Sequence, residues 1–272
     1  MKINIFDNCF SHFLPYSIPN RNSKYIEYEK NKLNYEGITI FTDNYLNNPI
    51  VSWVISKYKI AWILEPRSIH PHVYRKIIEL DKWYDFVLTH DKSLLDHNPE
   101  KYKFCPVGGC WITDENCRIH EKNKLISMIY SNKTSTKGHR LRHHIANNNY
   151  SIDLFGKGTN KILKNKEDGL IDYMFSVAVE NSSVPNYFTE KLIDCIAVGS
   201  VPIYWGCTNI GDFFDDRGII SFNDTDDLSQ IQKELDEKKY NSMLPYLKKN
   251  LLLLEDYKLT EDWIYKHFFK YL

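Results

Sequence analysis

Short apolar segments alternate with amphipathic segments along this chain, and this alternation limits its possible folds more than any other feature. Strands that alternate with helices are typical of β-α units built around parallel sheets. In the first half, the predicted strands are Lys2–Phe6, Ile38–Thr42, Ile60–Leu64, Phe86–Thr89 and Lys103–Pro106. Between them, Ile50–Lys57 and His72–Leu80 have the apolar spacing of helices.

The second half repeats the alternation after a polar stretch, Asp114–Lys124, which is the best linker candidate. Its predicted strands are Leu125–Tyr130, Ile152–Phe155, Ser176–Glu180, Val201–Tyr204 and Gly218–Ser221. Its predicted helices are His139–Asn147, Glu190–Val198, Leu228–Asp236, Met243–Leu254 and Glu261–Tyr271. With 272 residues, the chain suits one large domain or two small ones, and we expect two small α/β domains with a cleft between them.

Charge and cysteine content narrow the possible partners. The 35 basic and 35 acidic side chains give a formal net charge of +0, which argues against wholesale nucleic-acid binding. No apolar segment approaches the roughly 20 residues of a membrane span, so we expect a soluble, cytoplasmic chain without a membrane span. Six cysteines are too few for a disulfide framework, and we expect reduced thiols; they are Cys9, Cys105, Cys110, Cys117, Cys195 and Cys207.

One segment, residues 175–214, carries most of the functional information. An apolar strand, Ser176–Val179, leads into the polar residues Glu180–Ser183, and ligands of open α/β sheets bind at the carboxyl ends of strands. Thr189 is a predicted N-cap of the next helix, and Gly199 its predicted stop. A helix N-terminus attracts anions, so Lys191 in the first turn favours a diphosphate ligand there. The alternative is that the first-turn charges are simply solvated.

The same segment resembles the signature of the family 10 glycosyltransferases, the α1,3/4-fucosyltransferases. That pattern is approximately FxxxxENSxxxxYxTEKLxxxxxxGxVPIYWGxxNIxDF. It is matched here by Glu180-Asn181-Ser182, Tyr187, Thr189-Glu190-Lys191-Leu192, Gly199, Val201-Pro202-Ile203-Tyr204-Trp205-Gly206, Asn209-Ile210 and Asp212-Phe213.

The resemblance implies an α/β, GT-B-like fold, with two Rossmann-type domains facing across a cleft. We accordingly expect an acceptor-side domain at residues 1–120 and a nucleotide-sugar domain at residues 121–255. Residues 256–272 would form a helix that packs back on the first domain.

Two further roles follow from weaker parts of the resemblance. Upstream of the signature, Ser131-Asn132 precedes a basic stretch in which Arg142 matches the family's phosphate-binding arginine, with Arg140 as the rival. Nearer the N-terminus, the family has Gly-Glu-Asn, whose glutamate is taken as the catalytic base. Here the equivalent is Leu64-Glu65-Pro66, so only Glu65 is kept. The alternative for Glu65 is a strand-end carboxylate that caps a loop, and other candidate bases are His70, His90 and Asp91.

The activity implied by the resemblance is inverting transfer of fucose from GDP-β-L-fucose to a hydroxyl of a glycan acceptor. Arg142 and Lys191 would neutralise the leaving diphosphate, and Asn181, Tyr187 and Glu190 would contact the nucleotide sugar. No metal or other cofactor is expected, because we interpret the acidic stretches Asp212–Asp216 and Asp224–Asp227 as loop and cap residues. The alternatives are another GDP-sugar donor, a non-catalytic sugar- or nucleotide-binding protein, and, less well supported, a scaffolding protein.

Overall fold

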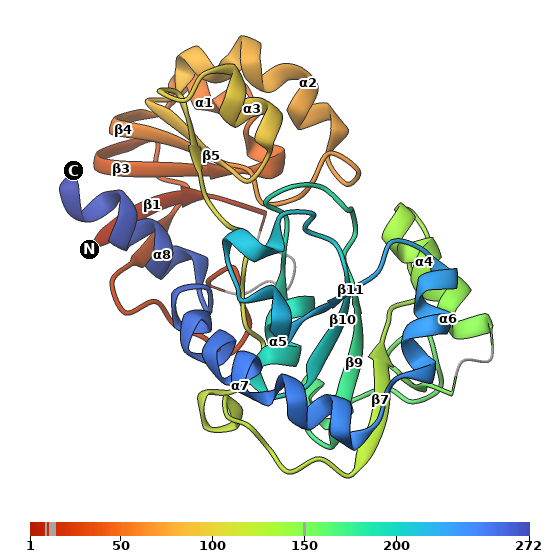
Figure 1. Ribbon diagram of the computed structural model, residues 1–272. Helices are drawn as coiled ribbons and strands as arrows, with labels where there is room; N and C mark the ends of the chain where they lie inside the picture. Colours follow the sequence, from red (N-terminus) through yellow and green to blue (C-terminus); the bar gives the residue numbers. More distant parts are fainter. Residues whose placement is uncertain (9, 11–14, 149–150) are drawn as a thin grey trace. The chain divides into compact units, whose positions relative to one another are not determined.

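The computed structural model of the protein describes residues 1–8, 10, 15–148 and 151–272, and it divides into two compact units (Figure 1). The first unit consists of Met1–Gly109, Pro185–Tyr187 and Leu259–Leu272. The second consists of Cys110–Val184 and Phe188–Lys258. The first division of the chain therefore falls after Gly109, where the sequence predicts one after residue 120.

A six-stranded parallel sheet forms the centre of the first unit, with the strand order β2-β1-β3-β4-β5-β6. Its core residues occupy both faces of the sheet, as is usual when helices and loops cover both sides of parallel strands. The strands are β1 (Lys2–Phe6), β2 (Glu27–Lys30), β3 (Asn34–Thr42), β4 (Ile55–Trp62), β5 (Phe86–Thr89) and β6 (Tyr102–Phe104).

The helices of the first unit correct one prediction. They are α1 (Ile50–Trp53), α2 (Pro71–Leu80), α3 (Lys92–His97) and α8 (Thr260–His267). The predicted helix Ile50–Lys57 is wrong beyond Trp53, because Val54 takes an extended backbone and Ile55 begins β4. β-branched side chains at both positions favour extended structure. Strand β2 and helix α3 were not predicted, since the first is short and polar and the second covers fewer than two turns.

Aromatic stacking ties the end of the chain into the first unit. In α8, the ring of Tyr265 stacks on that of Tyr25 at 4.5 Å, and Trp263 meets Phe104 edge-on at 5.8 Å. The buried carboxylate of Glu261 accepts hydrogen bonds from the amide and the hydroxyl of Ser17, both at 2.7 Å. The helical segment is shorter than predicted and ends at His267, before a 3-10 turn at Phe269–Tyr271.

The second unit is also built on a parallel sheet, with five strands in the order β11-β10-β9-β7-β8. Helices α5 and α7 pack on β9 and β10 (Figure 1). The strands are β7 (Lys124–Ile129), β8 (Asp153–Phe155), β9 (Tyr173–Val179), β10 (Val201–Trp205) and β11 (Ile220–Ser221). The helices are α4 (Lys137–Asn147), α5 (Glu190–Ala197), α6 (Thr225–Lys233) and α7 (Glu237–Leu253).

Two further findings concern the state of the cysteines and the search for a membrane-spanning helix. The cysteines at 105, 110, 117, 195 and 207 are free, and Cys9 lies outside the described residues. Within the part of the chain that the structure describes, no helix combines the length and the apolar character needed to cross a membrane.

Candidate active site

A buried glutamate joins strand β9 to helix α5 in the second unit. Glu180 directly follows β9 and has no exposed surface. Its carboxylate accepts hydrogen bonds from the amide of Thr189 at 2.8 Å and from the Thr189 hydroxyl at 2.7 Å. Thr189 is the N-cap of α5, as predicted, and its Oγ1 in turn accepts from the Lys191 amide. Glu180 of the signature therefore fixes the start of the helix that carries Glu190 and Lys191.

Lys191 lies among carboxylates at this helix start. Its Nζ is 3.0 Å from Glu190 Oε1 and 3.7 Å from Glu180 Oε2. Lys191, which is expected to favour a diphosphate ligand, thus also has acidic partners from its own chain. Its side chain keeps 24% of its surface exposed, so the ammonium group can still reach an external anion.

Arg142 reaches the same strand end from helix α4. One terminal nitrogen, Nη1, donates to the carbonyl of Val179, and Nη2 donates to Asn181 Oδ1 at 3.2 Å. The rival, Arg140, is exposed and donates to the carbonyls of Thr134 and Ser135. The structure therefore brings Arg142, and not Arg140, to the polar residues that follow β9.

Several basic side chains lie near the first turn of α4. His139, in the first turn of α4, is buried, and its Nδ1 accepts from the Thr136 amide in a capping box. Burial, followed by the charges of Arg142, Lys133, Lys191 and His143, lowers the pKa of His139 to about 4. The imidazole of His139 therefore binds a proton weakly.

Two glycines let backbone segments approach closely around Glu180. A Cβ on Gly138 would lie 1.7 Å from the Glu180 carbonyl oxygen. One on Gly206, the last residue of the VPIYWG match, would lie 2.5 Å from Glu180 Cγ. The predicted stop at Gly199 also holds, because this residue follows α5 with a φ of 77°. Gly138 and Gly206 therefore allow close packing around Glu180.

Tyr187 lies apart from the other predicted donor contacts. Pro185–Tyr187 belong to the first unit, where the Tyr187 side chain is 1% exposed and its ring lies 5.0 Å from that of His90. The structure thus groups Arg142, Asn181, Glu190 and Lys191 in the second unit, whereas Tyr187 is buried in the first.

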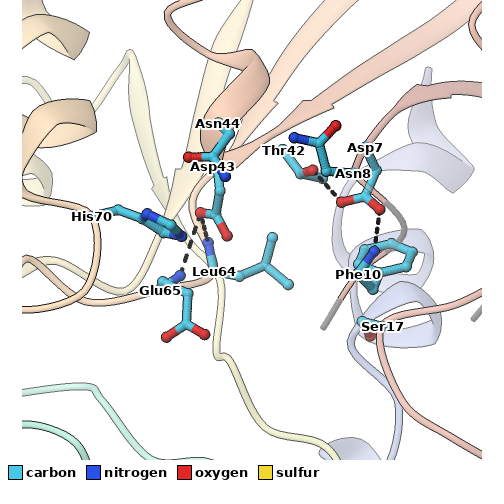
Figure 2. Close-up of a pocket in the computed structure, with 10 residues that line it drawn as sticks. All are labelled: Asp7, Asn8, Phe10, Ser17, Thr42, Asp43, Asn44, Leu64, Glu65 and His70. Carbon is cyan, nitrogen blue, oxygen red and sulfur yellow. Dashed lines mark hydrogen bonds between the residues drawn. The ribbon is translucent and has the colours of Figure 1, made fainter. Parts of the chain in front are cut away.

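The carboxyl ends of β1, β3 and β4 surround a polar pocket in the first unit (Figure 2). The pocket has a volume of about 190 Å³ and contains the predicted base, Glu65. Asp7 follows β1 and accepts hydrogen bonds from the Thr42 hydroxyl and the Phe10 amide. Asp43 follows β3 and points toward the loop that holds Glu65 (Figure 2).

Asp43 is a functional candidate that the sequence analysis missed. Its Oδ1 accepts from the amides of Leu64 at 3.0 Å and Glu65 at 3.4 Å. Burial, and then the charge of Glu65, raise the pKa of Asp43 to about 7. Its φ of 29° is unusual for a residue other than glycine, and such strain is concentrated at functional sites. The rule that singled out Glu180, a polar residue directly after an apolar strand, would also have found Asp43.

Hydrogen bonds fix the backbone of Glu65 at both its amide and its carbonyl group. Its amide donates to Asp43, and its carbonyl accepts from the Tyr74 hydroxyl at 2.8 Å. Strand β4 ends at Trp62, so Glu65 sits in a short loop and not at the strand terminus itself. Glu65 thus lines the pocket with a partly exposed side chain (Figure 2).

The other candidate bases differ in their surroundings. His70 also lines the pocket, and burial together with His72 lowers its pKa. His90 is 1% exposed, and burial lowers its pKa to about 4, so its imidazole binds a proton weakly. Asp91 caps α3 and forms a two-point ion pair with Arg67 at 2.7 and 2.9 Å. Asp91 therefore has a structural role.

The acidic stretches of the second unit are loop and cap residues, as predicted. Asp224 is the N-cap of α6, and Asp215 caps a 3-10 turn while it pairs with Arg217 and Lys249. Asp212 accepts from the Asn209 side-chain amide. Among the residues that the structure describes, no group of three or more histidine, cysteine or acidic side chains is arranged to hold a metal ion.

Comparison with known proteins identifies the family. The model "Glycosyltransferase family 10 (fucosyltransferase) C-term" matches residues 119–256, which is half of the chain. The "Alpha-(1,4)-fucosyltransferase" of Arabidopsis thaliana is 39% identical over 66 residues, which make up 23% of this chain and 16% of that protein. The "Alpha-(1,3)-fucosyltransferase FucT" of Helicobacter pylori is 33% identical over 78 residues, 29% of this chain and 16% of that protein. The chain thus spans about a sixth of the length of these relatives.

Solved structures show the same fold. A crystal structure of α1,3-fucosyltransferase with GDP superimposes with a TM-score of 0.57 at 16% identity, covering 94% of this chain and 89% of that one. The crystal structure of TarM gives a TM-score of 0.55 at 12% identity, over 84% and 53% of the two chains. The two parallel-sheet units are therefore the two domains of a GT-B-like fold. With the family model matching half of its length, the chain belongs to glycosyltransferase family 10, the fucosyltransferase family.

Proposed function

We propose that the protein transfers fucose from GDP-β-L-fucose to a hydroxyl of a glycan acceptor and forms an α-fucoside. The observation that carries this proposal is the meeting of Arg142 and Asn181 at the end of β9, beside the helix start that holds Lys191. Cations from two separate segments and the N-terminus of α5 would stabilise the negative charge that develops on a departing diphosphate. Solved family structures with GDP and with GDP-fucose share the fold.

In this proposal, the first unit supplies the base. Glu65 removes the proton from the acceptor hydroxyl in the pocket, and the acceptor oxygen attacks the anomeric carbon of the sugar. The bond from that carbon to the β-phosphate oxygen breaks, and GDP leaves on the opposite face. The anomeric centre is therefore inverted. Asn181, Tyr187 and Glu190 are the proposed contacts of the nucleotide sugar, with Glu190 accepting hydrogen bonds from sugar hydroxyls.

The proposed mechanism assigns charge stabilisation to Arg142, Lys191 and the helix N-terminus, and so it requires no divalent metal. Turnover should then persist in the presence of excess EDTA, whereas a loss that added Mg²⁺ or Mn²⁺ restores would contradict this part of the proposal.

The test of donor identity is a thermal-shift series with GDP-fucose, GDP-mannose, GDP and UDP-glucose. A ligand at 100 times its dissociation constant adds about 2.7 kcal/mol to the free energy of unfolding. We expect the largest shift with GDP-fucose and none with UDP-glucose. A larger shift with GDP-mannose would favour the same chemistry with another GDP-sugar.

The test of catalysis is GDP release measured with and without a panel of glycan acceptors. Acceptor-dependent release is expected of a transferase. Tight donor binding without release on any acceptor would favour the non-catalytic binding protein.

A further inference from the structure

Lys166 connects two acidic residues of helix α5 from a different part of the chain. It begins the 3-10 turn Lys166–Gly169, which lies between β8 and β9. Its Nζ is 2.6 Å from Asp194 Oδ2 and 3.7 Å from Glu190 Oε1. The ammonium group also lies over the Trp111 ring, 4.8 Å from the centroid. None of these contacts involves the residues matched by the fucosyltransferase signature except Glu190.

Glu190 and Asp194 need a cation between them. They are four residues apart on one helix, and like charges at this spacing repel each other. Asp194 is fully buried, and its other oxygen accepts from the Trp111 amide at 2.8 Å. A buried carboxylate without a counter-charge is strongly unfavourable, and Lys166 provides that charge.

Glu190 has a second cation that has another task in the proposed mechanism. Lys191 Nζ lies 3.0 Å from the same oxygen, Glu190 Oε1, that Lys166 approaches. When Lys191 turns toward a diphosphate, Glu190 loses its nearer partner. Lys166 keeps its position, because its ion pair with Asp194 does not involve Lys191.

The ionisation of Glu190 agrees with this arrangement. Burial by itself would raise the pKa of this carboxyl, but the charges of Lys191 and Lys166 outweigh burial and hold the pKa well below its usual range. An ionised carboxylate only accepts hydrogen bonds, which suits a group that receives them from sugar hydroxyls.

We propose that Lys166 is a positioning residue, which holds the Glu190 carboxylate in place for the sugar of the nucleotide-sugar donor while Lys191 engages the diphosphate. This inference rests on the proposed function. Lys166 should affect the binding of the sugar part of the donor but not the binding of its nucleotide part. The two effects can be measured separately.

The experiment is isothermal titration of GDP and of GDP-fucose into the full chain and its variants. In Lys166→Met, we expect the dissociation constant of GDP to change less than twofold and that of GDP-fucose to rise about tenfold, as for the loss of a charge-assisted hydrogen bond. Lys166→Arg keeps the charge and should restore most of the preference for GDP-fucose. The matched control is Lys164→Met, because Lys164 is exposed and lies on the same loop; it should leave both constants unchanged.

A second variant covers the case in which Lys166→Met fails to fold because Asp194 is left unpaired. Lys166→Met combined with Asp194→Asn removes both charges, and the asparagine oxygen can still accept from the Trp111 amide. We expect this double variant to show the same selective loss of GDP-fucose binding.

The outcomes separate the two proposals. If the unmodified protein binds neither GDP nor GDP-fucose, the proposed function fails, and the role of Lys166 fails with it. If the unmodified protein prefers GDP-fucose and the Lys166 variants keep that preference, only the positioning role is wrong. An equal loss of both ligands in the double variant would also overturn it, since that result indicates a general structural effect.

Discussion

Both units place acidic side chains at the carboxyl ends of parallel strands, but the surroundings of these side chains differ. In the second unit, Glu180, Glu190 and Asp194 each lie within 4 Å of a lysine, at 3.7, 3.0 and 2.6 Å. In the first, the pocket holds Asp7, Asp43 and Glu65, and no lysine or arginine is among its described lining residues. Lysines therefore lie beside the acidic side chains of the second unit, whereas acidic side chains lie next to one another in the lining of the first unit's pocket.

The difference in charge corresponds to a difference in chemistry. Cations beside a helix start favour a departing anion, whereas burial and neighbouring carboxylates favour the protonated form of an acid. The raised pKa of Asp43, about 7, is a direct sign of the second environment. Burial, followed by the charges of nearby basic side chains, lowers the pKa of His139 to about 4. Two similar sheet edges thus carry different sets of side chains, which suits the separate roles that the proposed function gives them.

The largest expected effect is on the acidic pocket. Glu65→Gln removes the proposed base and should lower acceptor-dependent turnover by about 10²- to 10⁴-fold, the usual contribution of general base catalysis. The dissociation constant of GDP-fucose should stay the same, because the donor contacts are in other segments. Steady-state kinetics and titration of the donor measure the two quantities.

The control for Glu65→Gln is Asp96→Asn, which removes an exposed carboxylate that pairs with Lys92 on the surface of α3. This control should keep full turnover. If Glu65→Gln turns over at the rate of the unmodified protein, Glu65 is not the catalytic base. His70→Ala would then be the next variant to measure.

The next effect concerns the cationic strand end. Arg142→Ala and Lys191→Ala should each weaken GDP binding by roughly 10- to 150-fold, since a charge-assisted hydrogen bond contributes about 1.5–3 kcal/mol. The matched control is Arg140→Ala, because Arg140 lies on the same helix and its guanidinium is exposed. Titration calorimetry should show little change for the control. A larger loss for Arg140→Ala than for Arg142→Ala would reverse the assignment.

A smaller effect tests how tightly the second unit packs around Glu180. Gly138→Ala places a methyl group against the Glu180 carbonyl and should lower the free energy of unfolding by about 1–3 kcal/mol, the usual cost of overpacking. In Gly211→Ala, the added Cβ would meet its nearest atom at 3.5 Å, so stability should hardly change. Urea unfolding of both variants provides the measurement, and equal stability of the two would show that the strand end can relax.

The smallest effect is on pH dependence. Because the folded-state pKa of Asp43 is raised to about 7 from about 3.9 in an unfolded chain, the folded state binds this proton more tightly. Its contribution to stability is fully present below about pH 4 and is lost as the pH rises toward 7. The difference in unfolding free energy between the unmodified protein and Asp43→Asn should therefore change by about 1–2 kcal/mol between pH 4 and pH 8, after a discount for partial contact with water.

The expected sign is a loss of stability in the unmodified protein relative to Asp43→Asn as the pH rises. Thermal unfolding at a series of pH values checks it. A constant difference across this range would mean that Asp43 titrates as an ordinary exposed carboxylate.

Local pattern was enough to predict most of the sheet strands and the start of helix α5. Strand β1 and strand β5 match their predicted bounds, and Thr189 caps α5 as expected, because apolar periodicity and capping chemistry act between neighbouring residues. The prediction failed at Ile50–Lys57, where four residues of helical spacing run directly into a strand. In so short a segment, apolar spacing cannot distinguish a short helix from the strand that follows it.

The sequence by itself determined the fold class, the family and the residue types of the site, since these depend on periodicity and on a contiguous signature. Only the tertiary structure decided that Arg142 rather than Arg140 reaches Asn181, that Asp43 faces the loop of Glu65, and that Lys166 supports Glu190. Each of these pairs joins residues from different elements. Their distances follow from how helices and strands pack, and local sequence patterns do not specify them.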